Sequence, residues 1–156
     1  MDTVQIRAKY TGFQSRLGTW QKAIGKLDDY GCLFLSICSI AEEYNESHHN
    51  LRRMDILSFF MECLDREWVN TNCYCLNQLE MLKFATGVEW KREVVKTLPK
   101  EIPLEMYTVE HWYNARTGFD HFRRRWGDTL VNSVTVKEGV LKDYYTYTHP
   151  RECYGS

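Results

Sequence analysis

Hydrophobic and polar residues follow two different periods along the chain, and the change falls near residue 88. Before it, apolar residues recur at helical spacing over about residues 32–44, 51–67 and 78–86. After it, apolar and polar residues alternate over about residues 107–113, 121–126, 133–137 and 140–148, with turn signals between these segments. The pattern predicts an α+β protein. Its helical half covers about residues 30–87, and its antiparallel sheet half, a four-stranded meander, covers about residues 88–148.

The first predicted helix is apolar almost all round and begins with a Gly-Cys step. One stripe consists of Leu33, Ile37, Ile40, Ala41 and Tyr44, while Phe34 and Cys38 fill much of the other side. A helix of this kind lies at the centre of a domain. Gly31 is expected to permit backbone angles that other residues avoid at a sharp turn. A buried core helix that happens to begin with cysteine explains the same pattern.

Cys32 is nevertheless a candidate nucleophile because of its expected position at the start of this helix. Free N–H groups at a helix N-terminus favour an anion, so they lower the pKa of a thiol placed there. The same groups can donate hydrogen bonds to an oxyanion. The sequence therefore offers a chemical role for Cys32 beside the structural one.

The first thirty residues carry weaker signals. Alternation over residues 4–10 predicts a short strand, and two glycines then mark a loop. Residues 19–25 are expected to form a turn or helical segment that covers the start of the Cys32 helix. Either Gln14 or Gln21 could place an amide near the thiol, and Gln21 is a candidate binding residue. A solvated helix position explains Gln21 equally well.

Composition narrows the class of protein. The chain has 156 residues, of which 44% are hydrophobic and 26% charged, and this describes one globular domain over residues 1–156. A net charge of −1 makes nucleic acid an improbable partner. No apolar run reaches the roughly eighteen residues of a membrane span, and no signal peptide begins the chain, so no membrane association and a cytoplasmic location are expected. The six cysteines are expected to be reduced, and neither a metal site nor a cofactor is predicted.

Two histidines compete as a base for Cys32. A hairpin that turns near Gly118 would bring His111 opposite residues 125–127 and place Asp128 beside it. His121 precedes Asp128 by seven residues, so the two would lie more than ~20 Å apart on one extended strand. This geometry favours His111 with Asp128, and His121 stays an alternative base. A structural or surface role explains either histidine as well.

The run Tyr30 to Ser36, YGCLFLS, resembles the cysteine helix of papain-like peptidases of the bacteriocin-processing branch. The run Trp126 to Val136, WGDTLVNSVTV, is similar to the strand-ending aspartate and turn of that branch. Both runs also resemble segments of an uncharacterised family of small proteins carried by spirochaete plasmids and phages. The resemblance implies a papain-like fold, in which a central Cys-bearing helix packs on the C-terminal sheet. It also implies a peptide or protein substrate, with Cys32 as nucleophile, His111 as base and Asp128 as the orienting residue.

A basic run next to a tryptophan suggests a different function. Arg123, Arg124 and Arg125 precede Trp126, and arginine with an aromatic residue can bind phosphate or stacked bases. In a strand, Arg124 would face away from its two neighbours, so a solvated face explains the run as well. The second hypothesis is therefore a catalytically degenerate papain-like interaction module. It would bind a host protein or a nucleotide through Arg124 and Trp126.

Overall fold

The computed structural model describes residues 19–27, 30–50, 52, 55–126, 129–131 and 139–151. Residues 19–27 are helical, as expected for the segment before Cys32. The elements that follow are α2 (Cys32–Ser47), α3 (Ile56–Asp65), α4 (Gln78–Thr86), β1 (Lys91–Val95), β2 (Met106–Asn114), β3 (Phe119–Trp126), β4 (Thr129–Val131) and β5 (Val140–Thr148). Helices precede strands, which confirms the α+β class and the change of period near residue 88. The strands predicted at residues 4–10 and 133–137 lie outside the described residues.

Local sequence accounts for the ends of α3 and α4. The Asp55 carboxylate accepts hydrogen bonds from the N–H groups of Leu57 and Ser58, which caps α3. The Asn77 side chain accepts from the Glu80 N–H, which caps α4. Gly87 then ends α4 with φ of 81°, a left-handed conformation that suits glycine. The helix boundaries predicted from Asn77 and Gly87 are confirmed.

The sheet is antiparallel throughout, but its strand order is not that of a meander. The order is β1-β5-β2-β3-β4, so β5 lies between β1 and β2. Thr148 of β5 is opposite Lys91 on one side and Met106 on the other. β5 is therefore an interior strand, and its Tyr147 is fully buried. The meander prediction was wrong because alternation shows which residues form a strand but not which strand lies beside it.

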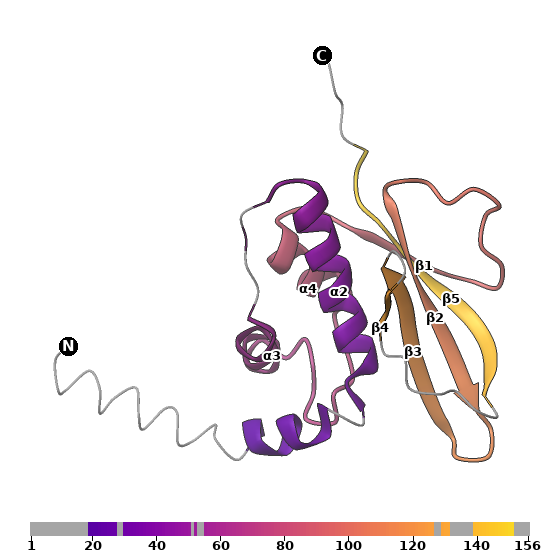
Figure 1. Cartoon of the computed structure of the whole chain (residues 1–156). Coiled ribbons are helices and arrows are strands. Elements are labelled where there is room, and N and C mark those ends of the chain that lie inside the picture. Colours follow the sequence, from indigo (N-terminus) through magenta and orange to yellow (C-terminus); the bar gives the residue numbers. More distant parts are fainter. Residues whose placement is uncertain are drawn as a thin grey trace, which may run out of the picture.

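Helix α2 packs on one face of this sheet, and it lies between the sheet and the helices α3 and α4 (Figure 1). The core joins the helical half to the sheet half through fully or almost fully buried side chains. These are Phe34, Ile37, Ile40, Phe60, Met81 and Leu82 from the helices and Tyr107, Val109 and Tyr147 from the strands. Within the described residues, no helix has both the length and the apolar character needed to cross a membrane.

The side of α2 that faces the sheet is polar. Cys32, Ser36, Ser39, Glu43 and Ser47 recur every three or four residues and so lie along one stripe of the helix. The Arg124 guanidinium donates from β3 to the Ser39 hydroxyl and to the Glu43 carboxylate. The buried apolar residues of α2 belong to one core cluster with side chains of α3, α4, β2 and β5. Helix α2 therefore carries its polar residues into the interior between helix and sheet.

Gly31 is required at the start of α2 because of a close contact, and its backbone angles are ordinary. Its φ of −88° is accessible to any residue. A Cβ added there would lie 2.3 Å from the Leu27 carbonyl oxygen, which accepts the Gly31 N–H at 2.9 Å. The expectation of unusual backbone angles was therefore wrong, and steric space is the reason for glycine.

We expect Gly31→Ala to lower the free energy of unfolding by about 2 kcal/mol, because the new methyl group must displace the Leu27 backbone. For a chain of this size, the melting temperature should fall by roughly 4–8 °C. Gly25→Ala is the matched control, since nothing lies within 4 Å of its Cβ position. Thermal unfolding followed by circular dichroism measures both variants. Equal melting temperatures would contradict the steric explanation.

Candidate functional site

Cys32 is the first residue of α2 and its thiol lies against β3. The sulfur accepts a hydrogen bond from the Phe122 backbone, and the Asp120 carboxylate is close enough to act on it electrostatically. Asp120 and Phe122 share one face of β3 because they are two residues apart in a strand. The start of α2 and this face of β3 therefore meet at the thiol.

His111 lies on β2 at the same part of the sheet. It is opposite Phe122 in the antiparallel ladder, and the two rings stack with centroids 4.5 Å apart. Its Nδ1 lies 2.8 Å from Asp143 Oδ1 on β5, and its Nε2 lies 2.6 Å from Asp120 Oδ1 on β3. The three adjacent strands thus bring a buried imidazole between two carboxylates.

Both ring nitrogens of His111 are engaged. Ionised carboxylates only accept hydrogen bonds, so both contacts are hydrogen bonds when both ring nitrogens carry a proton. Asp143 is almost buried, whereas the side chain of Asp120 is 48% exposed. Asp143 is therefore suited to holding the ring in place. Asp120 is the partner that can turn away towards solvent.

The Cys32 thiol is protonated in this arrangement. Burial raises its pKa, and the Asp120 carboxylate raises it further. Hydrogen bonds from the backbone of Phe122, Leu33 and Cys32 itself act in the opposite direction without offsetting burial. Burial also raises the pKa of the Cys63 thiol, to about 12. The helix N-terminus alone does not create a thiolate here.

We expect Asp120→Asn to increase the alkylation rate of Cys32 by iodoacetamide about three- to tenfold at pH 7.5. The substitution removes a negative charge that raises the thiol pKa, so a larger fraction is thiolate. Labelling of individual cysteines can be followed by peptide mass spectrometry. Labelling of Cys63 serves as the internal control and should not change. An unchanged or lower rate at Cys32 would show that Asp120 does not control the thiol.

The structure places the two candidate histidines on opposite faces of the sheet. His121 is opposite Trp112, and the side chains of this pair alternate with those of His111 and Phe122. His111 is the one on the face covered by α2. The expected register was wrong: His111 is opposite Phe122 and not residues 125–127, because the turn is centred near residue 116, before Gly118.

The other predicted site residues are distributed more widely. Asp128 lies outside the described residues. Trp126 ends β3, and its side chain also lies outside them. Gln21 is exposed on the helix formed by residues 19–27. Arg124 is buried and bonded to Ser39 and Glu43, so its guanidinium belongs to the interface between α2 and β3.

Sequence reasoning missed both carboxylates that contact His111. Asp143 could have been predicted, because it lies two and four residues before Tyr145 and Tyr147 and so shares their face of the last strand. Its direct position opposite His111 depends on β5 lying next to β2, which the meander excluded. Asp120 shares the face of Phe122 and Arg124, a pattern visible in the sequence. Its contact with His111 depends on the register of the β2–β3 hairpin, which the sequence did not predict correctly.

The fold and the site together define an α+β protein with a half-buried thiol at a helix start, beside a histidine–carboxylate cluster. No protein-family model matches the chain, and neither a curated protein nor a solved structure shows significant similarity to it. The assignment of a function therefore depends on the side chains of this chain.

Proposed function

We propose that this protein is a thiol hydrolase of papain-like design that acts on a peptide or amide bond. Cys32 would be the nucleophile, His111 the base and Asp143 the residue that orients the imidazole. The main support for the proposal is that the Cys32 thiol and the His111 ring interact with the same two residues, Asp120 and Phe122. The Cys32 thiol interacts with both residues, and the His111 ring contacts both from the neighbouring strand.

The order of events follows from the geometry. Asp120 turns towards solvent and carries the Nε2 proton away with it, which leaves Nε2 of His111 without a proton while Asp143 keeps the ring in place through Nδ1–H. His111 then takes the thiol proton, and the thiolate attacks the carbonyl carbon of the substrate. The backbone N–H groups at the start of α2 stabilise the resulting oxyanion. His111 returns the proton to the leaving amine, and a water molecule hydrolyses the thioester.

Asp120 has a defined place in this proposal. In the free protein it occupies the ring nitrogen that would receive the thiol proton, and its charge adds to the effect of burial, which raises the pKa of the thiol. A substrate that displaces Asp120 would remove both effects at once. The resting site would then be protected from oxidation and alkylation until substrate arrives.

Acylation by p-nitrophenyl acetate tests the proposal without knowledge of the natural substrate. We expect an acetyl group on Cys32, detected by peptide mass spectrometry, and release of p-nitrophenol that Cys32→Ser abolishes. Cys73→Ser is the control, since Cys73 is another thiol of this half of the molecule with a pKa raised by burial. Acetylation spread evenly over the cysteines, with no loss in Cys32→Ser, would refute the proposal.

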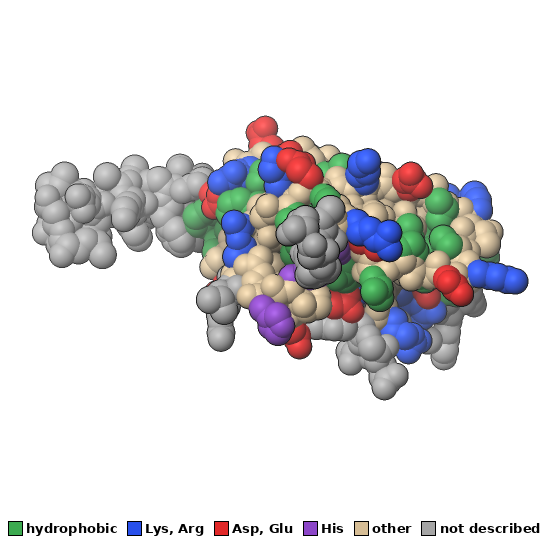
Figure 2. All heavy atoms as spheres, turned by 90° about the horizontal axis from the view of Figure 1, so that it is seen from above, with side chains coloured by type: hydrophobic (Ala, Val, Ile, Leu, Met, Phe, Trp, Pro, Cys, Tyr) green, Lys and Arg blue, Asp and Glu red, His purple; other side chains and the backbone are tan. Residues whose placement is uncertain are grey.

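An interaction module that binds through Arg124 is less well supported. The Arg124 side chain is enclosed between α2 and β3, where its charge is paired with Glu43. On the face shown in Figure 2, basic and acidic side chains of the described residues are interspersed. Neither feature provides the continuous basic surface that nucleic acid or a nucleotide would require.

A further inference from the structure

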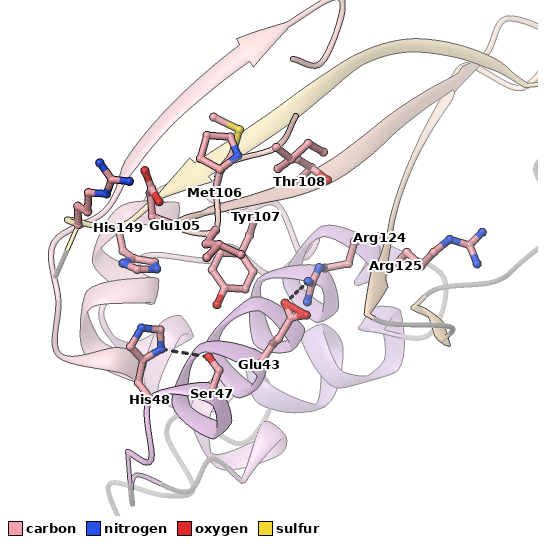
Figure 3. Close-up of a pocket in the computed structure, with 14 residues that line it drawn as sticks. Glu43, Ser47, His48, Glu105, Met106, Tyr107, Thr108, Arg124, Arg125 and His149 are labelled. Carbon is pink, nitrogen blue, oxygen red and sulfur yellow. Dashed lines mark hydrogen bonds and ion pairs between the residues drawn. The ribbon is translucent and has the colours of Figure 1, made fainter. Parts of the chain in front are cut away.

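A cavity of about 800 Å³ lies at the C-terminal end of α2, away from Cys32 (Figure 3). Its walls come from the end of α2, the start of β2, β3, the loop before β2 and the residues after β5. They include Glu43, Ser47, Tyr107, Arg124 and His149. A helix rises about 1.5 Å per residue, so Ser47 lies about 22 Å along α2 from Cys32. The cavity is therefore separate from the proposed active site.

Two buried polar atoms in the walls of this cavity have no hydrogen-bond partner among the described residues. They are Nε of Arg124 and Nε2 of His149, whose residues are 4% and 6% exposed. Arg124 Nε carries a proton and can only donate. His149 Nδ1 lies 2.9 Å from the Pro150 carbonyl oxygen, which can only accept, so the proton is on Nδ1 and Nε2 of the neutral ring is an acceptor.

The two atoms belong to residues on either side of Tyr107. The Arg124 guanidinium carbon lies 5.7 Å from the centroid of the Tyr107 ring, and the His149 ring centroid lies 6.1 Å from it. Tyr107 extends from β2 towards α2 between them in Figure 3. A ligand that satisfies both atoms must therefore bring an acceptor to one side of Tyr107 and a donor to the other. Buried polar groups without partners are costly, so such a ligand would gain affinity.

The charges and apolar residues of the walls restrict the ligand further. Three arginines (124, 125 and 151) and two glutamates (43 and 105) give a formal charge of +1 with neutral histidines. That balance suits a monoanion better than a phosphate dianion. The loop before β2 adds Ile102, Pro103 and Leu104, and Leu104 is 96% exposed. An apolar side chain of the ligand would bury this surface.

We infer that the cavity binds an α-carboxylate that is flanked by an amide N–H and an apolar side chain. This is the chemistry of a peptide C-terminus or of an acylated amino acid. The carboxylate accepts from Arg124 Nε, the amide N–H donates to His149 Nε2, and the side chain packs on Ile102 and Leu104. In an extended peptide, the amide N–H of the residue before the C-terminal one lies about 7 Å from the carboxylate, so a peptide end spans the two sides of the ring better than an acylated amino acid does. The inference does not depend on the chemistry of Cys32.

Calorimetric titration with acetyl-Ala-Leu tests the inference. The free acid should bind at least about tenfold more tightly than its C-terminal amide, a difference of about 1.4 kcal/mol. Arg124→Lys keeps a charge for Glu43 but loses the Nε–H, and it should weaken binding of the acid about tenfold. Arg123→Lys is the matched control, because Arg123 faces the other side of β3 and contacts Glu110. Leu104→Ser, at an exposed position that cannot unfold the protein, should also weaken binding.

The competing outcomes are distinct. Acetyl-leucine that binds as tightly as acetyl-Ala-Leu would assign the site to acylated amino acids, and tighter binding of the dipeptide would assign it to peptide ends. Equal affinity for the acid and the amide would overturn the inference. Displacement of the acid by an equal concentration of inorganic phosphate would overturn it too, as would unchanged binding in Leu104→Ser together with Arg124→Lys. Cys32→Ser should bind the acid like the unmodified chain, which separates this site from the proposed hydrolase.

Discussion

Replacing Arg124 with methionine is expected to lower the free energy of unfolding by about 3 kcal/mol. The guanidinium donates to Ser39 at 2.7 Å and to Glu43 at 2.6 Å, and its side chain is 3% exposed. Removing one partner of a buried pair leaves the other charge without compensation, which is more costly than losing the attraction itself. The melting temperature should fall by roughly 6–12 °C in a thermal unfolding experiment.

The neighbouring arginine provides the control for this prediction. Arg123 forms an ion pair with Glu110 at 2.7 Å, but both side chains are partly exposed, so Arg123→Met should cost less than about 1 kcal/mol. Combining Arg124→Met with Glu43→Leu should recover most of the loss, because an apolar pair can replace a buried ion pair. Equal melting temperatures for the two single variants would show that the interface is more hydrated than the structure indicates.

The second large effect concerns catalysis and depends on the proposed function. His111→Gln should slow acetylation of Cys32 by p-nitrophenyl acetate about a hundredfold, the low end of what a general base contributes. Glutamine can still donate to Asp143, so the local packing is largely kept, but it cannot accept the thiol proton. The rate is measured from p-nitrophenol release, after thermal unfolding has shown that the variant is folded.

His121→Gln is the comparison that decides between the two histidines. His121 lies on the face of the sheet away from α2, so this substitution should leave the acetylation rate within about twofold. A large loss in His121→Gln, with none in His111→Gln, would reverse the assignment of the base. Equal rates in all three proteins would show that Cys32 reacts without help from a histidine.

The expected loss of stability in Arg124→Met and the expected loss of acetylation rate in His111→Gln both depend on the polar stripe of α2. A helix between two layers normally presents apolar residues to both. Here the stripe from Cys32 to Ser47 faces the sheet, and the Arg124–Glu43 pair fixes the C-terminal half of the helix to β3. Such a contact is directional, whereas apolar packing permits rotation. The ion pair therefore helps to hold Cys32 opposite the strand that carries Asp120.

Local sequence signals were enough to predict the type and the approximate limits of most elements. Period, capping residues and glycines are local signals, and they sufficed for the helix that begins at Cys32, the Asn77 cap, the Gly87 stop and the last strand. They also indicated that Cys32 and His111 belong to one site, an assignment that stays a proposal.

The residues that surround His111 could not be predicted from local signals, because they depend on which strands are neighbours in the folded chain. Asp143 reaches it because β5 lies between β1 and β2, and Asp120 reaches it because the hairpin turns near residue 116. Which strands pair depends on the apolar surface that whole faces of the sheet bury together. That total includes residues far apart in the sequence, so a local periodicity cannot reveal it. The environment of Arg124 likewise depends on the tertiary structure. The sequence is compatible with a solvated position, but Arg124 is buried, and α2 places Glu43 beside it as a partner for its charge.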